Sequence, residues 1–174
     1  MKIRQASNID IPEIARVHVD TWKTTYKNVF SDDYLAKMSY EKREQIWHQV
    51  FSNSSKDNNF TYVAENEFNQ IIGFANAGIE RENNLTYHGE LYAIYILKDC
   101  QRKGLGTKLF ESVVDRLQTM QINSMLVWVL NDNSACRFYQ KLGGIKVYSK
   151  DIERQETKLL EVAYGWEDIS IIRK

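Results

Sequence analysis

One segment, Leu91–Gly106, limits the folds open to this chain more than any other. An apolar run, Leu91–Leu97, ends at Lys98–Asp99. A turn with two glycines follows, and then an amphipathic stretch to about Met120. This order predicts a buried strand, a tight basic turn and a helix that begins at the turn. Unpaired backbone N–H groups at such a helix start attract anions, above all phosphate. We therefore expect a phosphorylated cofactor at this place.

The bulk composition is typical of a globular protein. The 174 residues predict one domain, residues 1–174, which buries roughly 70% of its unfolded surface without a disulfide or metal staple. The 23 basic residues equal the 23 acidic ones, which argues against a nucleic-acid partner. Cys100 and Cys136 form no disulfide framework. The N-terminus lacks a signal-peptide core, and no apolar run approaches the roughly 20 residues of a membrane helix. We expect a cytoplasmic protein with no membrane partner.

Helical patterns dominate the N-terminal third. Met1–Gln5 predicts a short edge strand, and Ser7–Asp10 offers capping side chains for a helix with Pro12 in its first turn. The buried face of that helix is predicted at Ile11, Ile14, Ala15, His18 and Trp22. The other segments predicted here are helices at Ser31–Lys37 and Ser39–Phe51 and a polar loop at Ser52–Asn59.

The rest of the chain alternates strands with helices, as mixed α/β folds do. The predicted helices are Leu105–Met120 and Asn133–Leu142, the second capped by Asn131 or Asn133 and ended by Gly143-Gly144. The predicted turns are a hairpin at Asn66–Asn69 and a solvated, charged turn at Asp151–Lys158. The predicted strands are Phe60–Glu65, Gln70–Glu80, Gly89–Leu97, Ser124–Leu130, Ile145–Lys150 and Lys158–Trp166.

Three glycine-rich phosphate loops can be compared with the turn Gln101–Gly106. A P-loop needs Gly-x-x-x-x-Gly-Lys-Ser/Thr, and here Thr107 and Lys108 follow at the wrong spacing. A dinucleotide fingerprint needs a third glycine, where this chain has Leu109. The third pattern, Gln/Arg-x-x-Gly-x-Gly/Ala, is satisfied in full. Its glycines let the backbone approach a diphosphate closely, so that successive N–H groups point at one anion.

This third pattern resembles the acetyl-CoA loop of the GNAT N-acetyltransferase superfamily, which also follows a buried strand and opens a helix. Asn133–Gly143 resembles the family's second signature, Asn…Phe-Tyr…Leu-Gly. The resemblance implies a mixed α/β (α+β) GNAT fold. Its central twisted sheet is mostly antiparallel, with about six or seven strands flanked by about four helices and a splayed strand pair at the cofactor.

The chain departs from many members of that family at one point. They have Gly-Phe where this chain has Gly143-Gly144, and their Asn lies one residue further from the Tyr. A bacterial-type subset of small-molecule or peptide N-acetyltransferases ends in Leu-Gly-Gly, and this chain looks like that subset. The N-terminal spacing that also resembles it is Thr21-Trp22, Tyr26, Tyr34-Leu35, Arg43 and Trp47.

The resemblance implies acetyl-CoA as cosubstrate and no metal. In the family, the strand before the glycine loop exposes its backbone to the pantetheine arm. Here that role falls to the main chain of Ile94, Tyr95 and Ile96, with the Ile94 N–H facing the thioester oxygen. Arg102 and Lys103 add positive charge near the diphosphate. The cofactor contacts implied outside the strand are Gln101, Arg102, Lys103, Gly104, Leu105, Gly106, Thr107, Asn133 and Phe138.

Two residues are candidates for proton transfer. Glu90 lies eleven residues before Gln101, a spacing that matches family members with a general base on this strand. Burial at the end of an apolar strand suits a carboxylate to base work near neutral pH, and a solvated strand-end carboxylate is the alternative. Tyr139 matches the general acid that protonates the coenzyme A thiolate. Its alternative is a core aromatic beside Phe138 and Leu142.

Other residues carry weaker signals. Trp22 and Tyr26 lie where the family's first helices overhang the acceptor pocket, or they are ordinary core aromatics. His18 reads as a core histidine. His48 and His88 show no metal-ligand spacing with either cysteine, so no metal site is predicted, and Cys136 lacks support as a nucleophile. Terminal strands of the family's fold often pair between subunits, which makes a homodimer one expected arrangement.

The leading hypothesis is an N-acetyltransferase that moves an acetyl group from acetyl-CoA to a primary amine by direct attack in a ternary complex. Polyamines come first among small acceptors, with amino acids, amino sugars and aminoglycosides open, and protein N-termini or lysines form a second class. An acyl-CoA-binding module without catalysis is the alternative, against which the intact loop, Glu90 and Tyr139 argue. A nucleic-acid-binding domain has no support from the zero net charge.

Overall fold

A seven-stranded sheet in the order β1-β2-β3-β4-β5-β7-β6 runs through the computed structural model, which describes residues 1–172. Neighbouring strands pair antiparallel, except that β4 and β5 run parallel. A parallel pair needs a long crossover connection, and a helix supplies it here. The strands are β1 (Lys2–Gln5), β2 (Phe60–Glu65), β3 (Ile71–Ile79), β4 (Gly89–Ile96), β5 (Met125–Leu130), β6 (Ile145–Arg154) and β7 (Thr157–Trp166).

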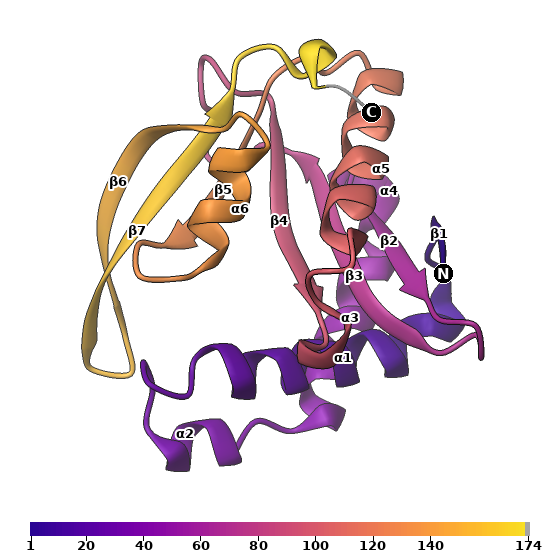
Figure 1. Ribbon diagram of the computed structural model, residues 1–174, viewed down its shortest axis with the longest axis vertical. Coiled ribbons are helices and arrows are strands. Elements are labelled where there is room, and N and C mark those ends of the chain that lie inside the picture. Colours follow the sequence, from indigo (N-terminus) through magenta and orange to yellow (C-terminus); the bar gives the residue numbers. More distant parts are fainter. Residues whose placement is uncertain (173–174) are drawn as a thin grey trace.

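Helices cover the two faces of this sheet (Figure 1). Helix α1 packs against α3 and lies across β3 and β4, while α5 packs against β2, β3 and β4. Helix α6 lies against β7. The helices are α1 (Ile11–Thr25), α2 (Asp32–Ala36), α3 (Tyr40–Ser52), α4 (Ser54–Asp57), α5 (Leu105–Thr119) and α6 (Ala135–Lys141), with 3₁₀ turns η1 (Asn8–Asp10), η2 (Lys98–Cys100) and η3 (Ile169–Ile171).

The central strands separate two apolar layers. On one face, Leu109, Val113 and Leu117 of α5 are fully buried in a cluster with apolar side chains from β2 to β5 and β7. On the other face, Ile14 of α1 and Trp47 of α3 pack in a second cluster. Because both faces are covered, β3 is buried along almost its whole length. Alternate side chains of β4 therefore serve opposite layers of the molecule.

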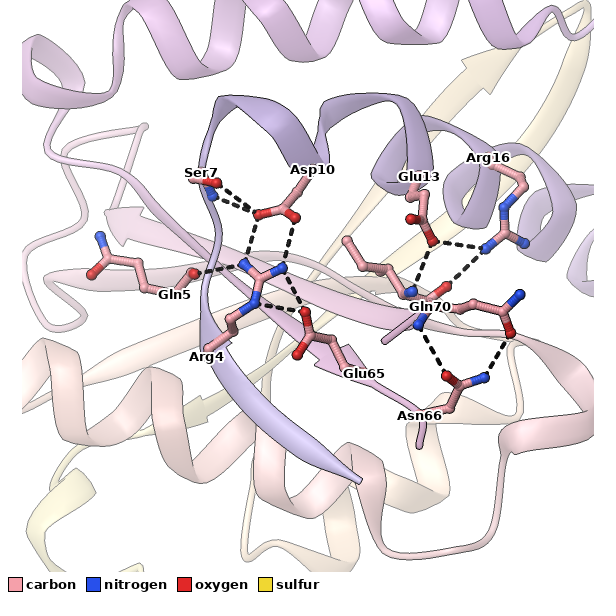
Figure 2. A network of polar contacts seen from close by, with 10 residues as sticks. Arg4, Gln5, Ser7, Asp10, Glu13, Arg16, Glu65, Asn66 and Gln70 are labelled. Carbon is pink, nitrogen blue, oxygen red and sulfur yellow. Dashed lines mark hydrogen bonds and ion pairs between the residues drawn. The ribbon is translucent and has the colours of Figure 1, made fainter. Parts of the chain in front are cut away.

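A polar network ties the N-terminal strand to the start of α1 (Figure 2). Arg4 donates from both terminal nitrogens to the two carboxylate oxygens of Asp10, each at 2.7 Å, and from Nε to Glu65 at 2.7 Å. Asp10 also accepts from the Ser7 N–H at 2.8 Å. The Arg4 hydrogen bonds lower the pKa of Asp10. These bonds fix the end of β1, η1 and the edge of β2 relative to one another.

A second set of bonds joins α1 to the first residue of β3 (Figure 2). The Ile71 N–H donates to Glu13 at 2.8 Å, and Arg16 donates to the Ile71 carbonyl at 2.8 Å. Both backbone groups of one strand residue are thus satisfied by side chains of the helix that crosses it. This contact sets the position of α1 over the sheet.

Strands β4 and β5 part soon after they meet. They share two paired positions, Gly89 with Met125 and Glu90 with Leu126. On the other side of β4, Asn76 and Ala77 of β3 face Ala93 and Leu91, so Tyr92 is an extra residue in the ladder. Such a bulge bends a strand and increases its twist. The splayed pair that the sequence predicted is therefore present, and it leaves one side of β4 open beyond Glu90.

The structure corrects three expectations. The predicted loop Ser52–Asn59 contains the one-turn helix α4. The stretch Asp151–Lys158 is not a solvated turn, because β6 extends to Arg154 and β7 begins at Thr157. The two turn residues, Gln155 and Glu156, have positive φ angles of 52° and 60°, as tight hairpins favour. About four helices were expected, and six occur among residues 1–172, two of them, α2 and α4, short. None of the helices in this range is long and apolar enough to span a membrane.

Candidate active site

A cleft of about 1440 Å³ opens where β4 and β5 part. Residues from both faces of the sheet line it, and so does the tip of the β6–β7 hairpin, which reaches toward the α1–α2 segment in Figure 1. Glu90 and Tyr139, the two candidates for proton transfer, both lie in its wall. The other predicted residues in the wall are Trp22, Tyr26, Ile94, Tyr95, Ile96, Gln101, Arg102, Gly104, Gly106, Thr107, Asn133 and Phe138.

The glycine turn is shaped by two residues with left-handed backbone. Arg102 has a φ of 60°, and Gly104, the N-cap of α5, has a φ of 78°. Gln101 fixes the turn to the preceding strand, since its Nε2 donates to the Ile96 carbonyl at 2.9 Å. Helix α5 begins directly after the turn, and the first N–H groups of a helix lack partners inside it. These donors and the positive end of the helix dipole form an anion seat at one end of the cleft.

Gly106 lies in the tightest part of this seat. A Cβ at this position would lie 3.2 Å from two carbons of the Phe138 ring and 3.6 Å from Ile96. The first distance is closer than an ordinary side-chain contact, so a larger residue would displace the Phe138 ring. Phe138 belongs to the second sequence signature, and the two signatures therefore meet across the α5–α6 boundary. A side chain larger than that of alanine would therefore disturb this part of the seat.

Two predicted cofactor residues do not present their side chains to the cleft. The Lys103 ammonium donates to the Asp99 carbonyl at 2.9 Å instead of facing the anion seat. The Leu105 side chain is 2% exposed and belongs to the α5 core cluster. Their backbone N–H groups remain at the turn and the helix start, so any contact with an anion falls to the main chain. The Lys103 ammonium, which was expected to add positive charge near the diphosphate, instead bonds to Asp99.

Tyrosines from three elements meet at the parting of the strands. Tyr139 of α6 is 4% exposed, and burial raises the pKa of its hydroxyl above the ordinary value. Among residues 1–172, the Tyr139 hydroxyl makes no protein hydrogen bond, and it interacts electrostatically with Tyr26 and Tyr95. The Asn133 amide donates to the Tyr26 hydroxyl at 3.3 Å and accepts from the Ala135 N–H at 2.9 Å. Asn133 thus links the start of α6 to Tyr26. The N-cap of α6 is Ser134, and not Asn131 or Asn133 as the sequence predicted.

The α1 side of the cleft is lined by aromatic residues. The Trp22 indole donates to the Tyr95 hydroxyl at 3.0 Å, and the Trp22 and Tyr26 rings lie 4.6 Å apart. His18 packs 4.9 Å from the Tyr95 ring, and its Nδ1 accepts from the Trp47 indole at 3.3 Å. Burial, helped by a nearby arginine charge, lowers the pKa of His18 to about 3, so the ring is neutral at physiological pH. His18 therefore packs among the aromatic residues of the cleft wall, where it is partly exposed.

Glu90 is buried at the root of the splay and is not a solvated carboxylate. It is 2% exposed. The Arg81 side chain donates from Nε to Glu90 Oε2 at 3.0 Å and from Nη2 to Oε1. Arg81 also stacks over the Tyr92 ring, with its guanidinium carbon 4.4 Å from the ring centre. The carboxylate therefore faces the cleft with a cation as its neighbour.

Among the described residues, four arginines of the cleft were not predicted as site residues, and one of them, Arg137, lies on α6. Arg81 follows β3, Arg43 lies on α3 and Arg154 ends β6. Arg81 and Arg154 belong to no recognised motif. Arg43 was noted only as part of the N-terminal spacing that resembles the Leu-Gly-Gly subset. Arg81 lies in the connection between β3 and β4, and its partner Glu90 lies at the start of β4. The signal that could have predicted this pair is the buried carboxylate, because buried acids are rarely left without a partner.

A splayed parallel strand pair, a glycine turn that opens a helix, and a tyrosine at the junction define an acyltransferase of the GNAT type. The family described as the acetyltransferase (GNAT) family matches residues 19–144, and the chain belongs to this family. It is therefore an acetyltransferase of the class that uses acetyl-CoA.

Individual proteins resemble the chain over most of its length. The uncharacterized N-acetyltransferase YuaI of Bacillus subtilis is 36% identical over 171 residues, which cover 98% of this chain and 95% of that protein. The ribosomal-protein-alanine N-acetyltransferase of Brucella melitensis has the same fold, with a TM-score of 0.75 at 20% identity over 95% of this chain and 99% of that one. The PaiA N-acetyltransferase of Thermoplasma acidophilum, solved in complex with coenzyme A, gives 0.68 at 20% identity over 92% and 96%.

Proposed function

We propose that this protein transfers the acetyl group of acetyl-CoA to the primary amine of a small acceptor, with both substrates bound at once. The observation that carries the proposal is the cleft itself, which joins the anion seat of α5 to a buried tyrosine through the opening between β4 and β5. The coenzyme A in the Thermoplasma neighbour supports the same use of the fold. The proposal treats residues 1–174 as a single acetyltransferase domain that acts in the cytoplasm.

The cosubstrate fits the residues present. Backbone N–H groups from Arg102 to Thr107 and the start of α5 would hold its diphosphate. The open side of β4, at Ile94 to Ile96, offers backbone groups to the pantetheine arm because β5 has moved away. Gln101 keeps the turn in place through its bond to Ile96. Phe138, packed over Gly106, closes the seat from the α6 side.

Bound acetyl-CoA supplies an activated acetyl group as a thioester. The acceptor nitrogen forms a bond to the carbonyl carbon, the carbon–sulfur bond breaks, one proton leaves the nitrogen and one joins the sulfur. Tyr139 is the proposed donor to the sulfur, because its hydroxyl is buried, protonated at neutral pH and free of protein hydrogen bonds within the described residues. The cleft brings both reactants together, which removes much of the entropic barrier.

Glu90 is the proposed acceptor of the nitrogen's proton, directly or through water. It lines the cleft, and its carboxylate is the buried one at the root of the splay. Arg81 holds the Glu90 carboxylate in place by donating to both of its oxygens.

The experiment has two parts. Calorimetry with acetyl-CoA measures binding, and release of free thiol in the presence of an amine panel measures transfer. Binding together with turnover of at least one amine supports the proposal. Binding without turnover on any amine would favour the alternative, an acyl-CoA-binding module, and absence of binding by folded protein would remove the family-type cofactor site.

A further inference from the structure

Basic side chains dominate the wall of the cleft, and its acids are already engaged or exposed. Glu90 pairs with Arg81, and Glu161 pairs with Arg154 at 3.5 Å. The third acid of the wall, Asp132, is exposed on the turn after β5. An acceptor with a second ammonium group, such as a polyamine, would need a free carboxylate inside the cleft. Among the described residues, no carboxylate of the cleft wall is both buried and unpaired.

Arg43 is a half-buried cation with no anionic partner among residues 1–172. It lies on α3, is half-buried and lines the cleft. Across residues 1–172, its guanidinium forms neither an ion pair nor a side-chain hydrogen bond with the protein. Burial lowers its pKa, yet an arginine keeps its charge in proteins. Thr21 Oγ1, in the wall of the same cleft, is likewise buried without a hydrogen-bond partner among these residues. The buried Thr21 hydroxyl costs free energy until a partner satisfies it, and the half-buried Arg43 guanidinium gains from an anion that replaces its lost hydration.

The place of Arg43 separates it from the anion seat. It belongs to the α1–α3 layer, where Tyr95 and Trp47 also pack, whereas the start of α5 lies in the opposite layer. The Arg43 charge acts on Tyr95, and Tyr95 in turn interacts with Tyr139. Arg43, Tyr95 and the proposed proton donor Tyr139 thus line one cleft, with Arg43 in the layer opposite the start of α5.

We propose that Arg43 binds an acidic group, a carboxylate or a phosphate, on the acceptor, so that the acceptor is an amine of the amino-acid type and not a polyamine. This inference rests on the proposed acetyl transfer. The planar guanidinium can donate two parallel hydrogen bonds to two oxygens of a carboxylate or phosphate. This ion pair is stronger in a partly desolvated site than in water. Neutral His18 does not compete for the anion. Trp22 and Tyr26 offer an apolar wall for the rest of the acceptor.

The test compares matched amines that differ in the acidic group. L-phenylalanine is paired with L-phenylalaninamide, phosphoethanolamine with ethanolamine, and putrescine and spermidine stand for polyamines. We expect the acidic member of at least one pair to have a kcat/KM about tenfold higher or more, as a charge-assisted pair provides. Arg43→Gln should raise KM for that acid about tenfold or more and leave its neutral partner within about twofold.

Two further variants keep the result interpretable. Arg43→Lys retains the charge without the fork and should give an intermediate KM. Lys42→Gln, at an exposed position next to it on α3, should change nothing. Acetyl-CoA binding by calorimetry should be equal in all variants, which also shows that they fold.

Several results would overturn the inference. Preference for the polyamines, equal rates for acidic and neutral partners, or an Arg43→Gln effect of the same size on both members would remove the acidic acceptor. If those results come with intact acetyl-CoA binding and turnover, the proposed acetyl transfer stands. If acetyl-CoA does not bind, both proposals fall.

Discussion

Arg81 forms a bidentate ion pair with Glu90, in which Nε donates to Oε2 at 3.0 Å and Nη2 donates to Oε1. The Glu90 side chain is 3% exposed and that of Arg81 is 61% exposed. A buried acid at the root of the cleft is thus paired with a largely exposed cation. Two predictions separate the chemical role of this pair from its structural role.

Glu90→Gln should lower kcat about 100-fold at neutral pH, the usual order for loss of a general base, with acetyl-CoA affinity changed less than about twofold. The amide keeps the shape of the side chain but cannot accept a proton. Steady-state thiol release and calorimetry measure the two quantities. Glu161→Gln removes a different paired carboxylate of the cleft and serves as the control. An equal loss in both variants, or none in Glu90→Gln, would contradict a base at Glu90.

Arg81→Gln should lower the free energy of unfolding by about 2 kcal/mol, because it leaves a buried carboxylate without its cation. The figure is below the usual loss for a fully buried pair because Arg81 is 61% exposed. The double variant Arg81→Gln/Glu90→Gln should recover part of the loss, since no buried charge remains. Urea denaturation measures all three proteins. Strict additivity of the two single changes would show that the pair is not coupled.

Tyr139→Phe should lower kcat about 100-fold while the free energy of unfolding stays within about 0.5 kcal/mol. The reason for the second part is that the hydroxyl has no protein hydrogen bond to lose in the described structure. Tyr164→Phe is the matched control, because that ring packs 6.1 Å from Tyr139 and its hydroxyl accepts from Gln140. Full activity in Tyr139→Phe would assign this residue to the core alone.

Gly106→Val should reduce acetyl-CoA affinity about tenfold or more, because the side chain collides with Phe138 and covers N–H groups of the helix start. Calorimetry measures the loss. Arg116→Val introduces the same residue at an exposed position of α5, outside the cleft, and tests for a general effect on the helix. Binding that is weakened equally by both would place the effect in helix stability and not in the seat.

Protonation of His18 should destabilise the fold in acid. Its pKa is about 3 in the folded protein, against 6.5 as its ordinary value, so the unfolded chain binds the extra proton first. The free energy of unfolding then falls as the pH drops below 6.5, by up to about 1.4 kcal/mol per pH unit, until the pH reaches the folded pKa. His18→Phe should flatten this slope between pH 6 and 4.5. The exposed His48, replaced by Gln, should leave it unchanged.

Features that depend on interactions between residues close together along the chain could be predicted from the amino-acid sequence. Turn chemistry placed the start of α5 at Leu105, and helical spacing placed Leu109, Val113 and Leu117 on one buried face. The contact of Asn133 with the start of α6 could be predicted for the same reason, although the N-cap is Ser134, one residue after the predicted cap. These local rules were enough to identify the glycine turn and the second signature, and therefore the resemblance to the family.

Which distant residues share the cleft depends on long-range packing and could not be predicted from local patterns. The extra residue Tyr92 bends β4 away from β5, and no pattern in a single strand shows a bulge that exists only against its partner. The exposed, charged half of β6 read as a turn because its partner β7, and not burial, holds it as a strand. Arg43 and Tyr95 lie far apart in sequence, and their proximity depends on how α3 packs on α1 and α1 on the sheet. Side-chain charge balance in a cleft is a property of such long-range packing, which local periodicity does not encode.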